Sequence, residues 1–206
     1  MYEVEVKVPA SHDAVRAALA DSDAECVGTV AQADTYFDAP HRDFAETDEA
    51  LRVRRVATAA ETFERDAVQG GLTAAIDAVL DGEYRAEGES RVTYKGPLLE
   101  AESKSREEFE TAVGSGEEMR EILSRLGFEP AATVRKLRET HHVDDFEVLL
   151  DAVEDVGEYV EVETEVESDS EVEAAREDAY ALLRQLGLDP ADQIRTSYLG
   201  LKLADA

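Results

Sequence analysis

The strongest constraint on the fold is an alternation of charged and apolar residues in several short segments. The chain begins MYEVEVKVPA, in which Glu3, Glu5 and Lys7 are separated by valines. Because neighbouring side chains of a β-strand point to opposite faces, this spacing predicts a strand with one apolar and one charged face. An ordinary strand with one solvated face explains this segment by itself. The alternative interpretation is that the charged face places two carboxylates and an ammonium group at a site.

The same alternation recurs along the chain, with charges that a random acidic surface does not explain. The net charge is −28, yet the middle segments place basic side chains on one face. Three of the five lysines fall at such alternating positions. The basic residues concerned are Lys7, Arg52, Arg54, Lys95, Lys136 and Arg138, and a late segment, YVEVETEV, places Glu161, Glu163 and Glu165 on one face. The charged faces therefore favour a common site over independent solvated surfaces.

The order of the segments predicts an α+β fold built as one domain over residues 1–206. About eight or nine strands, joined mostly by short turns, predict a closed antiparallel eight-stranded β-barrel with helices packed outside. Helices are expected in SHDAVRAALADSD, capped by Ser11, in SGEEMREILSRLGF, capped by Ser115, and over residues 171–186. Closure would turn the apolar faces outward under the helices and the charged faces into the lumen.

Residues 57–91 interrupt the strand pattern. This segment is rich in alanine, glycine and acidic residues, with one helical pattern around residues 72–80. We interpret it as an insertion between two barrel strands, either a surface lobe or a mobile flap, and of the two we predict a flap at the entrance of the lumen.

The acidic composition limits the partners of the protein. A net charge of −28 in 206 residues repels nucleic acid and anionic membranes, so neither is an expected partner. The excess of acidic residues and the preference for arginine over lysine are typical of a halophilic archaeal protein. The N-terminus has no basic region followed by an apolar core, and no apolar run approaches 18 residues. We therefore expect a cytoplasmic protein.

Sulfur and imidazole groups are few. The single cysteine, Cys26, excludes a disulfide framework, and we expect it to be a small buried residue with no thiolate metal site in the chain. The adjacent pair His141 and His142 resembles a metal motif, but adjacent residues of a strand point oppositely, so a surface location is favoured.

The predicted lumen has a basic wall and a group of carboxylates. Arginine and lysine side chains hold phosphate oxygens, the arginine as a bidentate fork and the lysine as a point charge. Carboxylates hold hard cations such as Mg²⁺, which bind phosphate through shared oxygens. This combination favours a metal-dependent site for a polyphosphate chain.

The segment EVEVK resembles the ExExK signature of the CYTH domain family, the triphosphate tunnel metalloenzymes. Further stretches resemble the class IV adenylate cyclase branch of this family, in the same order: DTYFDAPHRDF, TDEALRVRR, TYKGP, KSREEFE, LGFEPAATVRKLRE, LLDAVEDVGEYVEVETEV and SYLGL. The resemblance extends over nearly the whole chain. The insertion at residues 57–91 departs from it, because relatives have a short connection there.

The resemblance implies roles for individual residues. Mg²⁺ or Mn²⁺ would be held by Glu3, Glu5, Asp151, Glu161 and Glu163. The triphosphate would be held by Lys7, Arg52, Arg54, Lys95, Arg106, Lys136 and Arg138, with Glu108 as a further candidate in the strand after Arg106. Glu3, Glu5 and Lys7 of the signature are the expected catalytic residues.

The activity that the resemblance implies is conversion of ATP to cyclic AMP and pyrophosphate. The alternative enzyme is a tripolyphosphatase, or a thiamine or nucleoside triphosphatase, on the same scaffold. A third alternative is a binding module for triphosphate or polyphosphate without catalysis. The resemblance also allows a homodimer.

Overall fold

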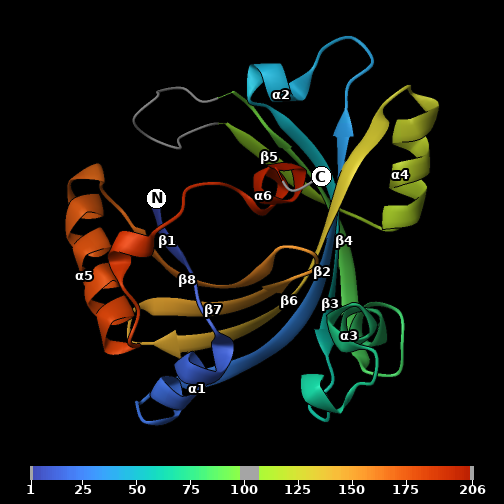
Figure 1. Ribbon diagram of the computed structural model, residues 1–206. Coiled ribbons are helices and arrows are strands. Elements are labelled where there is room, and N and C mark those ends of the chain that lie inside the picture. The colour runs from blue at the N-terminus through green and yellow to red at the C-terminus, as the bar shows by residue number, and fades with distance from the viewer. Residues whose placement is uncertain (1, 98–106, 205–206) are drawn as a thin grey trace. The chain divides into compact units, whose positions relative to one another are not determined.

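The computed structural model describes residues 2–97 and 107–204 (Figure 1). Its strands are β1 (Tyr2–Pro9), β2 (Glu25–Asp38), β3 (Ala50–Ala59), β4 (Arg85–Lys95), β5 (Glu108–Val113), β6 (Glu129–Val143), β7 (Phe146–Val153) and β8 (Gly157–Val166). Its helices are α1 (His12–Ala20), α2 (Phe44–Thr47), α3 (Gly71–Leu80), α4 (Gly116–Arg125), α5 (Val172–Gln185) and α6 (Tyr198–Ala204).

The strands form an eight-stranded sheet in the order β1-β8-β7-β6-β2-β3-β4-β5. This confirms the α+β class and the number of strands. The order has two end strands, β1 and β5, which are not paired with each other in the part of the chain that the structure describes. Closure into a barrel is therefore not confirmed.

The chain divides into two compact units. The terminal unit contains Met1–Val30, Gly70–Thr73 and Lys136–Ala206, and the central unit contains Ala31–Gln69 and Ala74–Arg135. The long strands β2 and β6 contribute residues to both units. The expected insertion does not form a unit of its own.

The terminal unit has an apolar face and a charged face, as the alternation predicts. β1 pairs with β8, and β8 pairs with β7, both antiparallel. Two valines of β1 and two of β8 form a buried core with residues of β7, α1 and α5. Its members include Val6, Val8, Val160, Val162, Val148, Leu150, Val15 and Leu183. Figure 1 shows α1 and α5 against these strands, with α6 on their other side. Burial of this one face places the charged residues of the same strands together on the opposite face.

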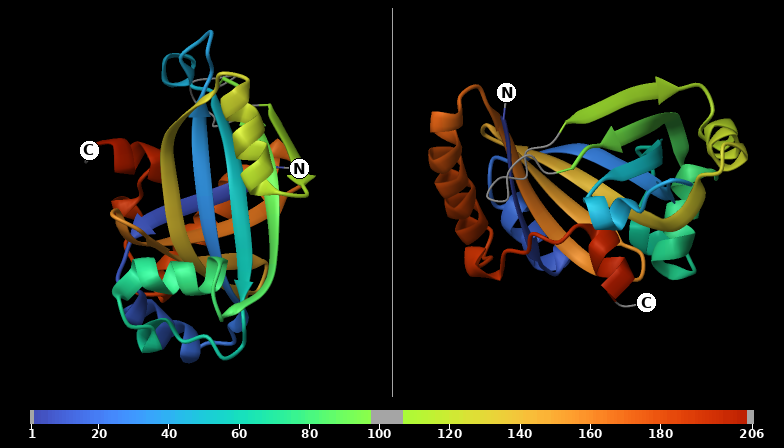
Figure 2. Two further views of the ribbon diagram at one scale, coloured as in Figure 1. Left: turned by 90° about the vertical axis from the view of Figure 1, so that its right-hand side faces the viewer. Right: turned by 90° about the horizontal axis from the view of Figure 1, so that it is seen from above.

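The central unit pairs β3 with β4 and β4 with β5, both antiparallel. α4 covers one face of these strands, where its Leu123 packs with Phe37 of β2 and Val53 of β3 (Figure 2, left). α4 begins as predicted, because the Ser115 hydroxyl accepts a hydrogen bond from the backbone N–H of Glu118. Ser11 precedes α1 in the expected position, but its side chain makes no capping hydrogen bond.

The segment between β3 and β4 is shorter than the insertion expected at residues 57–91. β3 continues to Ala59 and β4 begins at Arg85, so the segment outside the strands is residues 60–84. Val79 and Leu80 of α3 are buried, and ion pairs join Arg55 to Asp81 and Arg135 to Asp77. The helix in this segment is thus a packed element of the fold, which argues against the predicted mobile flap.

No helix in the described part of the chain combines the length and the apolar character needed to cross a lipid bilayer.

We predict that Leu183→Ala lowers the free energy of unfolding by about 2–5 kcal/mol, because it removes a fully buried side chain and leaves a cavity under the sheet. Leu203→Ala, at an exposed position of α6, is the control and should change the same quantity by less than about 0.5 kcal/mol. Urea denaturation of both variants measures the difference. Equal effects would contradict the assignment of the core to the α5 face.

Candidate functional site

The charged face of the terminal unit is built by antiparallel pairing. Lys7 lies opposite Glu161, and Glu5 lies opposite Glu163 in the β1–β8 ladder. In the β6–β7 ladder, Arg138 lies opposite Asp151. Since these residues occupy alternating positions, all of their side chains project from the face that α1 and α5 leave uncovered.

Asp151 is the centre of the basic part of this face. Its side chain has no exposed surface, and Lys136 Nζ donates to its Oδ2 at 2.7 Å. Arg138 Nε and Nη2 donate to Oδ1 and Oδ2 at 2.7 and 2.6 Å, which is a bidentate pair. Burial raises the pKa of Asp151, but the two cations and their hydrogen bonds outweigh it and hold this pKa well below its usual range.

Lys7 is the third cation of this face, and like Lys136 it is buried. Its Nζ lies 3.5 Å from Glu161 Oε1 and 3.7 Å from Glu5 Oε1. Arg138 forms an ion pair with the second oxygen of Glu161. Glu161 therefore joins Lys7 to Arg138, and its buried carboxylate interacts favourably with both cations.

An aromatic side chain from α6 covers the two lysines. The ring centroid of Tyr198 is 4.5 Å from Lys7 Nζ and 5.0 Å from Lys136 Nζ. The backbone N–H of Ile194, just before α6, donates to the carbonyl oxygen of Lys7 at 2.9 Å. Both ammonium groups thus have a cation–π contact that desolvated surroundings strengthen. The closing segment SYLGL gave no indication of this role.

Three carboxylates lie together beside the cations. Glu3, Glu5 and Glu163 each offer an oxygen within 4.8 Å of the other two. Burial, with the negative charges of Glu161, Glu5 and Glu3, raises the pKa of Glu163 to about 8, although Arg138 opposes this shift. These are hard oxygen donors of the kind that Mg²⁺ and Mn²⁺ take, so the donor set fits such an ion.

In the structure, the five metal ligands expected from the resemblance fall into two groups with different partners. Glu3, Glu5 and Glu163 form the acidic cluster, whereas Asp151 and Glu161 are bonded to basic side chains. Contact with cations does not exclude metal binding, and the role of Asp151 and Glu161 as ligands stays a prediction.

The central unit brings together Arg52 and Arg54, which were expected to hold phosphate. Arg54 Nε and Nη2 donate to the two oxygens of Asp34 at 2.7 and 2.6 Å, and Arg52 Nη1 lies 3.3 Å from the same carboxylate. Sequence reasoning missed Asp34, the first residue of the stretch DTYFDAPHRDF. Asp34 is buried in β2, but a single aspartate in a strand gives no periodic signal that could have identified it.

The other basic residues expected in this unit have different surroundings. Lys95 Nζ is 2.9 Å from Glu108 Oε2, so the further candidate Glu108 pairs with a predicted phosphate ligand. Thr93 donates to Glu110 at 2.8 Å, and Arg91 donates to the same residue at 2.8 Å. Arg106 lies outside the described residues.

Two expectations about sulfur and imidazole groups are wrong. Cys26 is exposed instead of buried. His141 is only 8% exposed, while its neighbour His142 is exposed, so the pair does not lie at the surface as a whole. The opposite orientation of the two rings follows the strand alternation.

Comparison with known proteins identifies the family. The profile of the CYTH domain matches residues 1–198. The chain belongs to the CYTH domain family. A Methanocaldococcus jannaschii protein named "Putative adenylate cyclase" is 33% identical over 171 residues, which are 83% of this chain and 81% of that protein.

Two solved structures resemble this chain in fold but differ in how similar their sequences are to it. A Pyrococcus horikoshii protein is 32% identical, with a TM-score of 0.75 and full coverage of both chains. A Hippeastrum protein, titled "Putative adenylyl cyclase" with a dominant triphosphatase activity, is 18% identical. Its TM-score is 0.59, with 98% of this chain and 95% of that chain covered, which shows a common fold.

We predict that Asp151→Asn lowers the free energy of unfolding by about 3–5 kcal/mol, because it removes the buried carboxylate that Lys136 and Arg138 share and leaves the buried Lys136 without this anion. Asp155→Asn is the control, since Asp155 is exposed and its left-handed backbone tolerates asparagine. Urea denaturation compares the two variants. A similar small effect of both would show that Asp151 does not hold the basic group together.

We predict a pH effect of Glu163 on stability in the presence of a chelator. Its pKa in the fold, about 8, lies above the usual 4.5, so the folded state favours the protonated form. Stability from this group is therefore fully present below pH 4.5 and is lost as the pH rises through 8. Glu163→Gln should reduce the fall in unfolding free energy between pH 5 and pH 9 by about 3 kcal/mol.

Glu165→Gln provides the matched control for this measurement. Glu165 lies two residues along the same strand and is exposed, so its substitution should leave the fall in stability intact. Identical pH profiles of wild type and Glu163→Gln would contradict the raised pKa.

Proposed function

We propose that this CYTH protein is a metal-dependent enzyme that acts on the triphosphate chain of a nucleotide, as a class IV-type adenylate cyclase. The observation that supports the proposal is the arrangement on one face of the terminal unit. Two buried lysines, Lys7 and Lys136, and the half-buried Arg138 lie beside the acidic cluster of Glu3, Glu5 and Glu163. The name of the relative from Methanocaldococcus jannaschii favours the cyclase.

Phosphate binding is the role proposed for the cations. A triphosphate is a strong anion, and Arg138 offers a planar fork while the lysines offer compact charges. Asp151 fixes Lys136 and Arg138 before any substrate arrives, so little reorganisation is needed on binding. Arg52, Arg54, Lys95 and Arg106 stay predictions as further phosphate ligands.

Metal binding is the role proposed for the acidic cluster. Glu3, Glu5 and Glu163 would hold Mg²⁺ or Mn²⁺, with Glu161 and Asp151 as the further predicted ligands. When bound, the ion would lower the pKa of the ribose hydroxyl and neutralise phosphate charge. Glu163 would lose its proton on binding, because a carboxylate coordinates in the ionised form.

The cyclase reaction requires a bond exchange at the α-phosphorus of ATP. The ribose 3′-oxygen forms a bond to this phosphorus and loses its proton, while the bond to the oxygen of the β-phosphate breaks. Pyrophosphate leaves with the electron pair, and cyclic AMP is the other product. Lys7, Lys136 and Arg138 would stabilise the charge that accumulates on the leaving pyrophosphate.

A triphosphatase is the second candidate. The observation that favours it is the solved Hippeastrum protein, whose title gives triphosphatase as its dominant activity. The same cations and carboxylates would serve this reaction, with water instead of the ribose hydroxyl as the nucleophile. A non-catalytic binding module is less supported, since the residues expected for metal binding are all present.

The test is one assay at high KCl with Mg²⁺ or Mn²⁺, in which purified protein receives ATP or tripolyphosphate. Cyclic AMP with pyrophosphate from ATP is the expected result. Release of orthophosphate from either substrate, without cyclic AMP, would contradict the cyclase activity and support the triphosphatase activity. No turnover of either substrate would contradict both enzymatic functions and leave the binding module.

We predict that Glu5→Gln lowers metal-dependent turnover at least about 100-fold, because it removes one carboxylate of the acidic cluster. Glu165→Gln, on the same charged face but outside this cluster, should retain most of the activity. Measurement of kcat at increasing Mn²⁺ concentration compares them. Full activity of Glu5→Gln at low Mn²⁺ would refute the assignment of the metal.

A further inference from the structure

A second group of potential metal ligands lies in the terminal unit, away from the acidic cluster. The Cys26 sulfur of β2, a carboxylate oxygen of Glu139 and a ring nitrogen of His141 in β6 all lie within 4.8 Å of one another. Glu139 and His141 alternate with Arg138 along β6, so they project from the opposite face of that strand. This group is therefore not part of the charged face.

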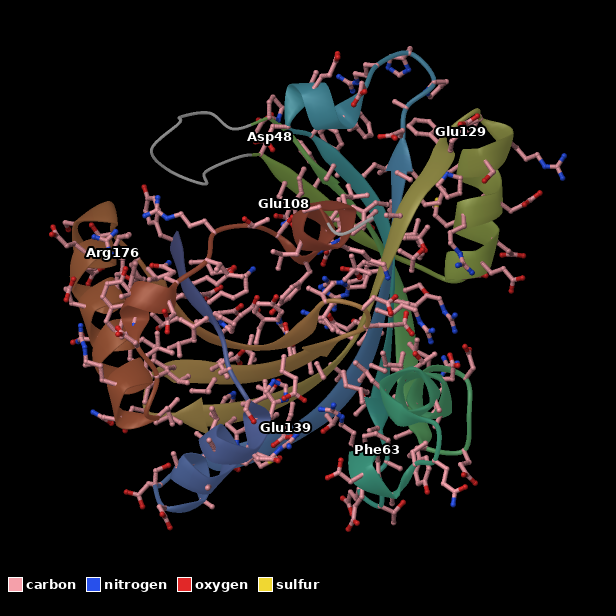
Figure 3. The ribbon with its side chains drawn as sticks, viewed as in Figure 1. Asp48, Phe63, Glu108, Glu129, Glu139 and Arg176 are labelled. Atoms are coloured by element: carbon pink, nitrogen blue, oxygen red, sulfur yellow. The ribbon has the colours of Figure 1, made fainter. Side chains whose placement is uncertain are left out.

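The histidine and the glutamate of this group are held in place. His141 is buried, and its Nε2 is 2.7 Å from Glu139 Oε1. The other oxygen of Glu139 accepts hydrogen bonds from Nε and Nη2 of Arg16 in α1, both at 2.9 Å. Figure 3 labels Glu139 beside α1. Arg16 thereby orients the carboxylate from behind, as outer hydrogen-bond partners of metal ligands do.

The thiol distinguishes this group from an ordinary ion pair. A buried histidine paired with a glutamate needs no third partner, and it would be stable with an alanine or serine nearby. Here the third side chain is the only cysteine of the chain, and its thiol is exposed to solvent. Its sulfur is close enough to both partners for one ion to contact all three with small side-chain movements.

The chemistry of the donors indicates the type of ion. Thiolate and imidazole are preferred by Zn²⁺ and similar transition metals, whereas Mg²⁺ prefers sites made of oxygen alone. Three protein ligands leave one position of a tetrahedral zinc site for water. We propose that Cys26, Glu139 and His141 form a separate binding site for a borderline-soft divalent metal ion. Zn²⁺ is the ion that we expect to bind there.

Cobalt provides a direct test of this site in the full-length protein. Co²⁺ replaces Zn²⁺ in such sites, and a Co²⁺–thiolate bond gives a charge-transfer absorption. Because the chain has one cysteine, this absorption reports Cys26 alone. The titration contains excess Mg²⁺, which occupies oxygen-only ligands such as the acidic cluster. A saturable absorption at one Co²⁺ per chain, removed by added Zn²⁺, is expected.

Variants separate a three-ligand site from a reactive thiol. Cys26→Ser should abolish the absorption, and Glu139→Gln and His141→Ala should each weaken Co²⁺ binding at least about 10-fold. His142→Ala is the matched control, because this neighbouring ring is exposed and pairs with Glu147 instead. Its Co²⁺ affinity should equal that of the wild type, and circular dichroism verifies that each variant is folded.

Two results would overturn the proposal. Absence of the thiolate absorption in the wild type would show that Cys26 is not a ligand. The same affinity in folded Glu139→Gln or His141→Ala as in the wild type would show adventitious binding by one exposed thiol. Neither result depends on turnover of ATP, so the proposed cyclase function stands or fails separately.

Discussion

The bidentate pair of Arg138 with the buried Asp151 is the interaction on which the proposed site depends. Asp151, whose side chain has no exposed surface, fixes two cations, and Glu161 connects one of them to Lys7. Without a central anion, three cations this close together would repel one another in low dielectric. The arrangement gathers three basic side chains, each held by carboxylates, on one face of a protein whose net charge is −28.

The alternation of residues was enough to predict which faces of β1 and β8 are apolar and which are charged. Apolar positions in β1, β7 and β8 determined which face packs against α1 and α5, and the charged face followed from the same periodicity. The periodicity of residues does not indicate whether the end strands β1 and β5 pair with each other. Closure into a barrel therefore could not be predicted from it. The start of β4 was also missed in the sequence. Gly88 and the acidic residues of β4 are not typical of a strand, and the pairing of β4 with β3 depends on residues far apart in the chain.

The residues of the candidate site could be predicted from the sequence, but the side chains that they contact could not. Strand alternation and family resemblance named Glu3, Glu5 and Glu163, yet neither could show that Asp151 and Glu161 are bonded to cations. Asp34 and Tyr198 escaped notice because a single aspartate or tyrosine in a strand or a terminal helix has no periodic signal. Burial of His141 beside an exposed Cys26 likewise depends on which strands become neighbours, which composition does not reveal.

The contact of Tyr198 with Lys7 joins the last helix to the first strand. During synthesis, β1 leaves the ribosome long before its partner strand β8 and before α6 exist. Its charged face stays solvated and without these ion pairs until β8 and α6 have been synthesised. Such distant contacts make folding slow, because the loop between them must close first. A chain that stopped before β8 would lack the anions of β8 and the ring of Tyr198, so the face assembles only in molecules that contain both elements.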